Sequence, residues 1–157
     1  MTTCNPSAGQ KAPSFTAITG DGKSISLADF RGKWVILYFY PKDDTPGCTK
    51  EACSLRDAHQ AIIDANAVVL GVSTDSTASH QKFSEKFGLP FTLIADTDIA
   101  VSNKYGVYGE KVRCGRTSLG INRTTFIINP EGVITRVFDK VNVEKHGEEV
   151  LAAIKAV

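Results

Sequence analysis

The sequence predicts an α/β fold in which a mixed central sheet is covered by helices on both faces. Apolar segments of strand length alternate with segments of helical periodicity along most of the chain, which is typical of strand–helix units with parallel strands. Toward the C-terminus, two apolar segments flank the turn sequence Asn129-Pro-Glu-Gly132, so their strands are expected to pair antiparallel. Parallel and antiparallel pairs together make the predicted sheet a mixed one.

The first elements are a hairpin, a buried strand and a long helix. Residues 15–19 and 24–27 alternate and flank the turn sequence Gly20-Asp-Gly22, which predicts an N-terminal β-hairpin. Residues 34–40 are apolar at every position, as expected of a strand that is covered on both faces. After a polar turn, the pattern predicts a helix over residues 48–65.

The rest of the chain continues the alternation of strands and helices. In order, we expect a strand over 68–72, a helix over 76–88, a strand over 91–95, a helix over 99–105, strands over 123–128 and 133–138, and an amphipathic C-terminal helix. Ser76 is a typical N-cap residue and Gly88 a typical helix stop. Residues 106–120 are rich in glycine and basic side chains, a composition that predicts an exposed, mobile loop.

Length and charge restrict the classes of function. A chain of 157 residues with 42% hydrophobic residues has the size of one domain, here residues 1–157 with a loosely ordered lead-in at 1–12. Eighteen basic and 17 acidic residues leave a formal net charge of +1, which favours neither nucleic acid nor a membrane as partner. The N-terminus lacks signal-peptide features, and no apolar run reaches the roughly 20 residues of a transmembrane helix. We therefore expect a soluble, cytoplasmic protein, and no long exposed apolar stretch argues against a monomer.

The most informative feature is a pair of cysteines, Cys48 and Cys53, at the start of the predicted long helix. Cys48 follows the buried strand through a polar Pro/Gly turn, so unpaired helical N–H groups and the helix dipole favour its thiolate. Cysteines are commonly buried in the core, but the residues Thr45-Pro-Gly before Cys48 are polar and turn-forming. A thiolate with a second thiol five positions later indicates redox chemistry.

The same segment resembles a known family. Pro41, Thr45 and Cys48 match the Pro-x-x-x-Thr-x-x-Cys signature of peroxiredoxins, and residues 38–53 resemble the bacterioferritin comigratory, or peroxiredoxin Q, branch. Further likeness lies in Gly9 to Phe15, Gly71-Val-Ser and Arg123-Thr-Thr-Phe. The resemblance implies a thioredoxin-like fold and a thiol-dependent peroxidase that reduces hydrogen peroxide and alkyl hydroperoxides. It also implies thioredoxin as the reductant and no metal, haem or flavin cofactor.

Four residues are candidates for the peroxide step. We expect Cys48 to attack the peroxide as the peroxidatic thiolate, with the hydroxyl of Thr45 turned into the pocket as a donor to the departing oxygen. Pro41 ends the strand, and in the family it shields the thiolate from water. Arg123 is assigned by the resemblance alone, because the residues themselves favour an ordinary surface arginine. Glu51, one turn after Cys48, is interpreted either as a helix cap or as a residue that orients Arg123.

Cys53 is the candidate resolving thiol, which would condense with the sulfenic acid of Cys48 to form a disulfide. On an intact helix, five residues separate two Cα atoms by roughly 8–9 Å, whereas a disulfide needs them within about 7 Å. We therefore expect the first turns of the helix to unwind in each cycle. A buried structural cysteine is the alternative interpretation. Some members of the branch carry the resolving thiol on the next helix, where this chain has only serines such as Ser84.

The remaining thiols and the histidines carry no motif. Cys4 and Cys114 match no family position, and we expect both to be free thiols. His59, His80 and His146 share no spacing, so they are interpreted as ordinary surface or partly buried residues.

Three other functions are alternatives to the peroxidase. A peroxide-sensing redox switch would use the same chemistry for signalling. A thiol–disulfide oxidoreductase usually has Cys-x-x-Cys spacing, which the gap between Cys48 and Cys53 does not match. A structural zinc module would need Cys48, Cys53 and Cys114 as ligands, but no matching second pair is present.

Overall fold

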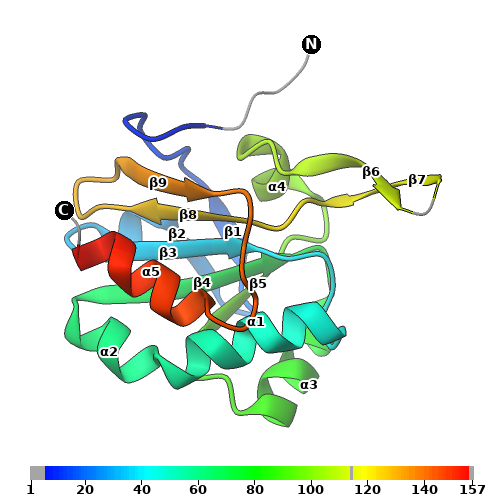
Figure 1. Cartoon of the computed structure of the whole chain (residues 1–157), viewed down its shortest axis with the longest axis horizontal. Coiled ribbons are helices and arrows are strands. Elements are labelled where there is room, and N and C mark those ends of the chain that lie inside the picture. The colour runs from blue at the N-terminus through cyan, green and yellow to red at the C-terminus, as the bar shows by residue number, and fades with distance from the viewer. Residues whose placement is uncertain (1–5, 114, 156–157) are drawn as a thin grey trace.

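Five strands form the central sheet of the protein (Figure 1). They are β3 (Trp34–Phe39), β4 (Ala67–Ser73), β5 (Thr92–Ala95), β8 (Thr124–Ile128) and β9 (Ile134–Phe138). Their order in the sheet is β5-β4-β3-β8-β9. The central strand β3 pairs parallel with β4 and antiparallel with β8, which confirms the predicted mixed sheet. This computed structural model describes residues 6–113 and 115–155.

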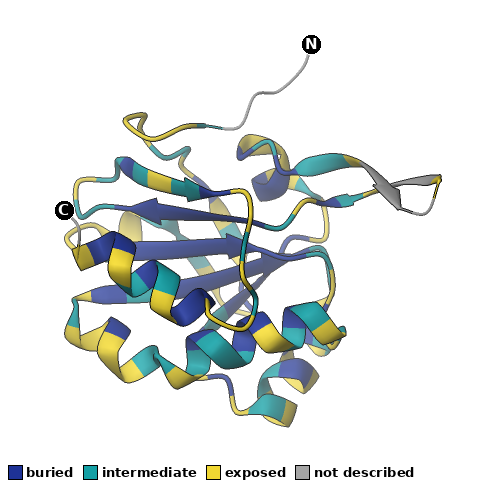
Figure 2. Cartoon of the chain, in the orientation of Figure 1, coloured by how far each residue is buried: buried dark blue, intermediate teal, exposed yellow. Residues whose placement is uncertain are grey.

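Helices and a hairpin cover the two faces of this sheet. The elements are α1 (Pro46–Asp57), α2 (His59–Asp64), α3 (Thr77–Phe87), α4 (Ala100–Lys104), α5 (His146–Lys155), the 3-10 helix η1 (Leu27–Phe30), β1 (Thr16–Ile18) and β2 (Ser24–Ser26). One face packs on α1, α2, α3 and α5 through a cluster that includes Ile36 and Leu55. The other face packs on α4, η1 and the β1–β2 hairpin through a cluster that includes Leu37 and Val101. Figure 2 shows that β3, β4 and β8 are buried along almost their full length.

The helix expected over residues 48–65 is two helices, which corrects that prediction. α1 and α2 are separated at Ala58, whose φ is −91° and ψ 0°. No glycine or proline marks this break, and α5 packs against the chain at this point. A Cβ atom on Gly147 would lie 2.5 Å from the carbonyl oxygen of Ser54 and 2.8 Å from Ala58 Cβ, so α5 lies directly on the backbone here.

The mobile loop expected over residues 106–120 is a β-hairpin, so that prediction was wrong. β6 (Tyr108–Arg113) pairs antiparallel with β7 (Arg116–Ile121), and the hairpin projects from the body of the protein (Figure 1). Gly109 and Gly120, which indicated a loop, face each other in the ladder, and Gly115 turns the chain with φ at +75°. Ile121 is buried in the core and fixes the base of the hairpin.

Local sequence signals correctly predicted both ends of α3. Ser76 Oγ accepts a hydrogen bond of 3.1 Å from the N–H of Ser79, and Gly88 ends α3 with φ at +60°. At the N-terminus, the N–H of Gly9 donates to the carbonyl oxygen of Ile134 at 2.7 Å, so the chain runs beside β9. Within residues 6–113 and 115–155, none of the helices has the length and apolar character needed to cross a membrane.

Candidate active site

Cys48 lies at the N-terminal end of α1. Thr45 is the N-cap residue, Pro46 is the first helical residue and Cys48 is the third. The residue is 2% exposed and belongs to the core cluster beneath α1. Because the first N–H groups of a helix have no partner within the helix, the sulfur lies beside partial positive charge, which favours an anion there.

Arg123 contacts this sulfur from the neighbouring strand. It directly precedes β8, and the sheet register pairs Thr124 with Phe39, the last residue of β3 before the turn to Cys48. Arg123 Nη2 lies 3.3 Å from Cys48 Sγ and donates to it. A Cβ atom on Gly47 would lie 3.1 Å from the same nitrogen, so the missing side chain leaves room for the guanidinium.

Glu51 holds the guanidinium from a second direction. Its Oε1 accepts a hydrogen bond of 2.6 Å from Arg123 Nη1, and its side chain is fully buried. The carboxyl group therefore orients Arg123, and the alternative interpretation as a helix cap is wrong. Burial raises the pKa of Glu51 to about 7, although Arg123 acts to lower it. Burial also acts to lower the pKa of Arg123, but Glu51 and Cys48 together raise it above its ordinary value.

Thr45 and Pro41 lie in the turn before Cys48, and the hydroxyl of Thr45 is hydrogen-bonded elsewhere than to the sulfur. Thr45 Oγ1 donates a hydrogen bond of 2.9 Å to the carbonyl oxygen of Lys42, so its proton points back into the turn. Pro41 is half-buried and follows Tyr40 at the end of β3. Both residues thus shape the turn that leads to Cys48.

Cys53 lies on the same helix as Cys48, is partly exposed and, like Cys48, is a free thiol. Just after it, Ser54 Oγ accepts a hydrogen bond of 2.9 Å from the N–H of Gly147. Two residues later, Arg56 Nη1 donates to the carbonyl oxygen of Phe87 at 2.7 Å. The end of α1 beyond the cysteines is therefore held to α5 and to the end of α3.

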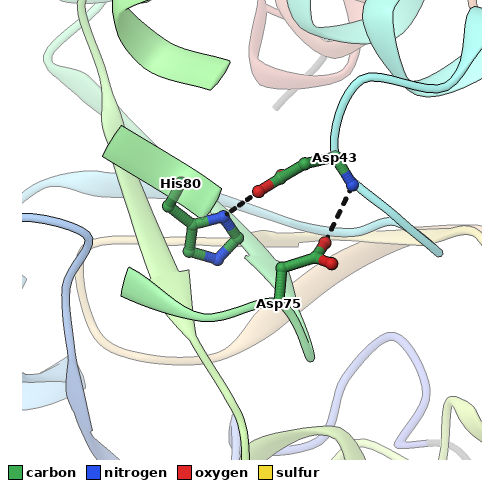
Figure 3. Close-up of side chains that lie close together, drawn as sticks. All are labelled: Asp43, Asp75 and His80. Atoms are coloured by element: carbon green, nitrogen blue, oxygen red, sulfur yellow. Dashed lines mark hydrogen bonds and ion pairs between the residues drawn. The ribbon is translucent and has the colours of Figure 1, made fainter. Parts of the chain in front are cut away.

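A buried polar network, which the sequence analysis missed, fixes the turn before α1. His80 is 1% exposed, with Nδ1 2.7 Å from Asp43 Oδ2 (Figure 3) and Nε2 2.8 Å from the carbonyl oxygen of Ile94. Asp43 Oδ1 also accepts from the Tyr40 hydroxyl at 2.5 Å, and its N–H donates to Asp75 Oδ2 at 2.8 Å. The interpretation of His80 as a surface or partly buried residue is therefore wrong. Its two partners lie on other elements, which no local pattern reveals.

The same network is the one group of side chains, among residues 6–113 and 115–155, that could surround a metal ion. Its members are Asp43, Asp75 and His80 (Figure 3). Each ring nitrogen of His80 already lies within hydrogen-bond distance of an oxygen, so hydrogen bonds alone account for the arrangement of this group. The zinc module considered above needs Cys114, which lies outside the described residues, as does Cys4.

Two buried groups beside Glu51 were also missed. His146, the first residue of α5, is fully buried, with Nε2 2.8 Å from Thr125 Oγ1 and 3.7 Å from Glu51 Oε2. The hydroxyl of Tyr38 is buried and has no hydrogen-bond partner among the described residues. Burial first, and then the charges of Glu51 and Cys48, raise the pKa of Tyr38 well above its ordinary value. His59 is partly buried, as predicted.

Comparison with known proteins identifies close relatives. Residues 8–137 match the AhpC/TSA family. The chain is 54% identical over 146 residues to Putative peroxiredoxin bcp of Coxiella burnetii, covering 93% of this chain and 97% of that protein. It is 43% identical to Peroxiredoxin Bcp of Bacillus subtilis, with 94% of each protein covered.

Solved structures agree with the sequence relatives. The structure of Xanthomonas campestris Peroxiredoxin Q matches with a TM-score of 0.88 and 38% identity, covering 95% of this chain and 97% of that chain. A structure concerned with the alkyl peroxide reduction activity of Xanthomonas campestris Bacterioferritin Comigratory Protein also has a TM-score of 0.88 and 38% identity, covering 95% and 98%. The thioredoxin-like fold and the resemblance stated from the sequence are thereby confirmed. The chain belongs to the AhpC/TSA family, as a peroxiredoxin of the Bcp or peroxiredoxin Q branch, and is a thiol-dependent peroxidase.

Proposed function

We propose that Cys48 is the peroxidatic thiol and Cys53 the resolving thiol, with Arg123, Thr45 and Pro41 completing the catalytic set. The observation that carries the proposal is the 3.3 Å contact of Arg123 Nη2 with Cys48 Sγ at the N-terminus of α1. A cationic donor and the helix dipole act on one buried sulfur, and both favour the reactive thiolate. The substrates are hydrogen peroxide and alkyl hydroperoxides.

In the first step, the Cys48 thiolate attacks one peroxide oxygen and the O–O bond breaks. The sulfur is oxidised to a sulfenic acid, and the departing oxygen leaves with the electron pair as hydroxide or alkoxide, which then takes up a proton. Arg123 donates one N–H to Cys48 and one to Glu51. The guanidinium has five N–H donors, so the others are free to bind peroxide oxygens as negative charge develops.

Thr45 and Pro41 act at the entrance to this step. The Thr45 hydroxyl donates to Lys42 in the reduced protein, so a rotation about its Cα–Cβ bond is needed before it can donate to a peroxide. Pro41 has no N–H to offer solvent, and its ring limits the access of water to the sulfur.

In the second step, the Cys53 thiol attacks the sulfenic sulfur of Cys48, forms the S–S bond and releases water. Because α1 is continuous between the two cysteines, residues 46–53 must unwind first. Asp43 holds the chain before this segment, and the bond of Gly147 to Ser54 holds it just after. These anchors support an unwinding that is confined to residues 46–53. A thioredoxin-like dithiol then reduces the disulfide and restores both thiols.

The proposal also covers the substrates, the domain organisation and the oligomeric state of the enzyme. Alkyl hydroperoxides are included because a relative with 38% identity is described by its alkyl peroxide reduction activity. We propose one domain over residues 1–157 and a monomer. Large exposed apolar side chains within the described residues are few, namely Ile18, Ile63 and Leu119, and they lie on different elements, which supports a monomer. The cytoplasmic location stays a prediction of the sequence.

Parallel cysteine variants test the proposal. Peroxide consumption with a thioredoxin system should be abolished by Cys48→Ser. Cys53→Ser should allow one rapid oxidation of Cys48, stop cycling with a dithiol and promote overoxidation to the sulfinic acid, which the protein mass reports. Cys4→Ser is the matched control and should keep full turnover.

Two outcomes would contradict the proposal. Full turnover by Cys48→Ser removes the assignment of the peroxidatic thiol. A wild-type protein that is oxidised once by peroxide but is not recycled by a thioredoxin system favours the sensing switch instead.

A further inference from the structure

The two oxygens of the Glu51 carboxyl group differ in their hydrogen bonding. The side chain is fully buried, and Oε1 accepts from Arg123, but Oε2 has no hydrogen-bond partner among the described residues. An unpaired buried carboxyl oxygen costs free energy that a neighbouring polar group can recover. The polar group that faces Oε2 is His146, whose Nε2 lies 3.7 Å away.

His146 is held in place from three sides. Its Nδ1 lies 2.9 Å from Glu149 Oε1, its Nε2 lies 2.8 Å from Thr125 Oγ1, and its ring packs edge-on against Phe138 with centroids 5.6 Å apart. A carboxylate only accepts hydrogen bonds, so the neutral ring carries its proton on Nδ1. Nε2 is then an acceptor with one lone pair, which either the Thr125 hydroxyl or a Glu51 O–H can use.

We propose that His146 is a positioning residue for the peroxide reaction and that it acts through Glu51. When Glu51 is protonated on Oε2, this O–H donates to His146 Nε2, and Oε1 stays turned to Arg123. A movement of about 1 Å brings the present 3.7 Å to hydrogen-bond length. Arg123 then keeps its orientation, while its positive charge is not neutralised by Glu51 and remains directed at the sulfur and the departing oxygen.

The protonation states of the pair support this role. Burial raises the pKa of Glu51 to about 7 and lowers the pKa of His146, so a carboxylic acid beside a neutral imidazole is the favoured pair below neutral pH. Glu149 is partly exposed and links His146 to solvent. The titratable and charged groups that surround Glu51 are Cys48 on α1, Tyr38 on β3, Arg123 before β8, and His146 and Glu149 on α5.

The inference predicts a pH-dependent effect of removing the ring. In His146→Leu, the protonated Glu51 has no acceptor and can turn its proton toward Arg123, which disorders the guanidinium. Above the pKa of Glu51, the carboxylate holds Arg123 by charge alone, and His146 is no longer needed. His146→Gln places a carbonyl oxygen near the position of Nε2 and should restore most of the lost rate.

The inference rests on the proposed role of Cys48, and its test measures the rate constant of Cys48 oxidation by hydrogen peroxide in the reduced full-length protein. Rapid quenching and mass spectrometry follow the oxidation between about pH 5 and pH 8. His146→Leu should be about tenfold slower than wild type below about pH 6 and within about twofold of it at pH 8, since one orienting hydrogen bond is lost. His59→Leu on α2 is the matched control and should equal wild type throughout. If the rate constant of His146→Leu divided by that of wild type is the same at every pH, the inference is overturned.

Two further measurements keep the outcomes distinct. If Cys48→Ser still reduces peroxide, the proposed function fails; if Cys48 is required and the ratio is flat, the inference alone fails. If His146→Leu does not fold, the wild-type protein is labelled with ¹³C at glutamate and ¹⁵N at histidine. NMR across pH then reports the protonation states of Glu51 and His146. Glu51 should titrate near pH 7 while His146 stays neutral, and a carboxylate that is ionised from pH 5 upward would refute the inference.

Discussion

Arg123 Nη2 lies 3.3 Å from Cys48 Sγ, although the two residues are 75 positions apart in the chain. Sheet register brings them together, because Thr124 faces Phe39 at the end of the strand that leads to Cys48. The contact joins the only local signal of reactivity, a thiol at a helix N-terminus, to a permanent positive charge from a distant segment. The proposed mechanism depends on this pair.

Removal of the guanidinium should slow the reaction of Cys48 with peroxide. Arg123→Met keeps the length of the side chain but removes its donors, and we expect the second-order rate constant to fall about 10²- to 10³-fold. Arg123→Lys keeps the charge without the planar fork and should lie in between. The control is Arg136→Met, an exposed position on β9, which should leave the rate unchanged. Equal rates for Arg123→Met and wild type are incompatible with this account.

Gly47→Ala should separate stability from activity. The new Cβ would lie 3.1 Å from Arg123 Nη2, so the flexible end of the arginine must move away from Cys48. Alanine is a better helix former than glycine by up to about 1 kcal/mol, so the free energy of unfolding in urea should be unchanged or higher. The rate of oxidation should nevertheless fall several-fold. Gly109→Ala, where no atom lies within 4 Å of the new Cβ, is the control, and an unchanged rate in Gly47→Ala would count against the prediction.

Hydrogen exchange should locate the unwinding that disulfide formation requires. Amides of residues 46–53 are expected to lose most of their protection after one equivalent of peroxide, because an intact helix keeps the two sulfurs apart. Amides after Ser54 should stay protected, since Gly147 and Phe87 hold that end of α1. Mass spectrometry of peptides from the reduced and oxidised protein measures this, with β3 as internal reference. Equal protection of residues 46–53 in both forms means that the disulfide closes by another route.

Glu51 should make the reduced protein less stable as pH rises. Burial raises its pKa from the ordinary 4.5 to about 7, so between these values the folded protein holds a proton that the unfolded chain has released. The stability due to this group is therefore complete below about pH 4.5 and is lost as pH rises through 7. The loss is on the order of 3 kcal/mol, because a pKa difference of one between the folded and the unfolded protein corresponds to about 1.4 kcal/mol of stability.

Urea unfolding at several pH values checks this contribution. Glu51→Gln does not titrate, so its free energy of unfolding should decline less than that of wild type between about pH 5 and pH 8. Glu131→Gln, in the exposed turn before β9, should follow the wild-type curve. If Glu51→Gln and wild type decline in parallel, the carboxyl group of Glu51 is ionised in the folded protein.

Much of the fold could be predicted because its signals are local. Ser76 begins α3 as its side-chain cap, and Gly88 ends α3 with a left-handed backbone. Each of these signals depends on the type of a single residue, so the sequence reveals it. The break at Ala58 could not be predicted, because no glycine or proline marks it in the sequence. The β6–β7 hairpin was missed because its glycines pair across strands, while composition alone indicated a loop.

In the candidate site, too, the residues with local sequence signals could be predicted and those with distant partners could not. The position of Cys48 follows from the strand, turn and helix that surround it, whereas Arg123 was found only through the resemblance to peroxiredoxins. The sequence left two interpretations of Glu51 open, and only its hydrogen bond with Arg123 in the structure decides between them. His80 and His146 carried no signal, because the partners of a buried histidine come from other elements.

The most direct test of the central claim asks whether the sulfur of Cys48 is ionised in the reduced, folded protein. The measurement is the ultraviolet absorbance of the thiolate across pH, taken as the difference between wild type and Cys48→Ser. We predict a thiolate difference signal in the reduced, folded protein at neutral pH, and loss of most of that signal on unfolding. Equal signals from the folded and the unfolded protein at neutral pH would contradict the account.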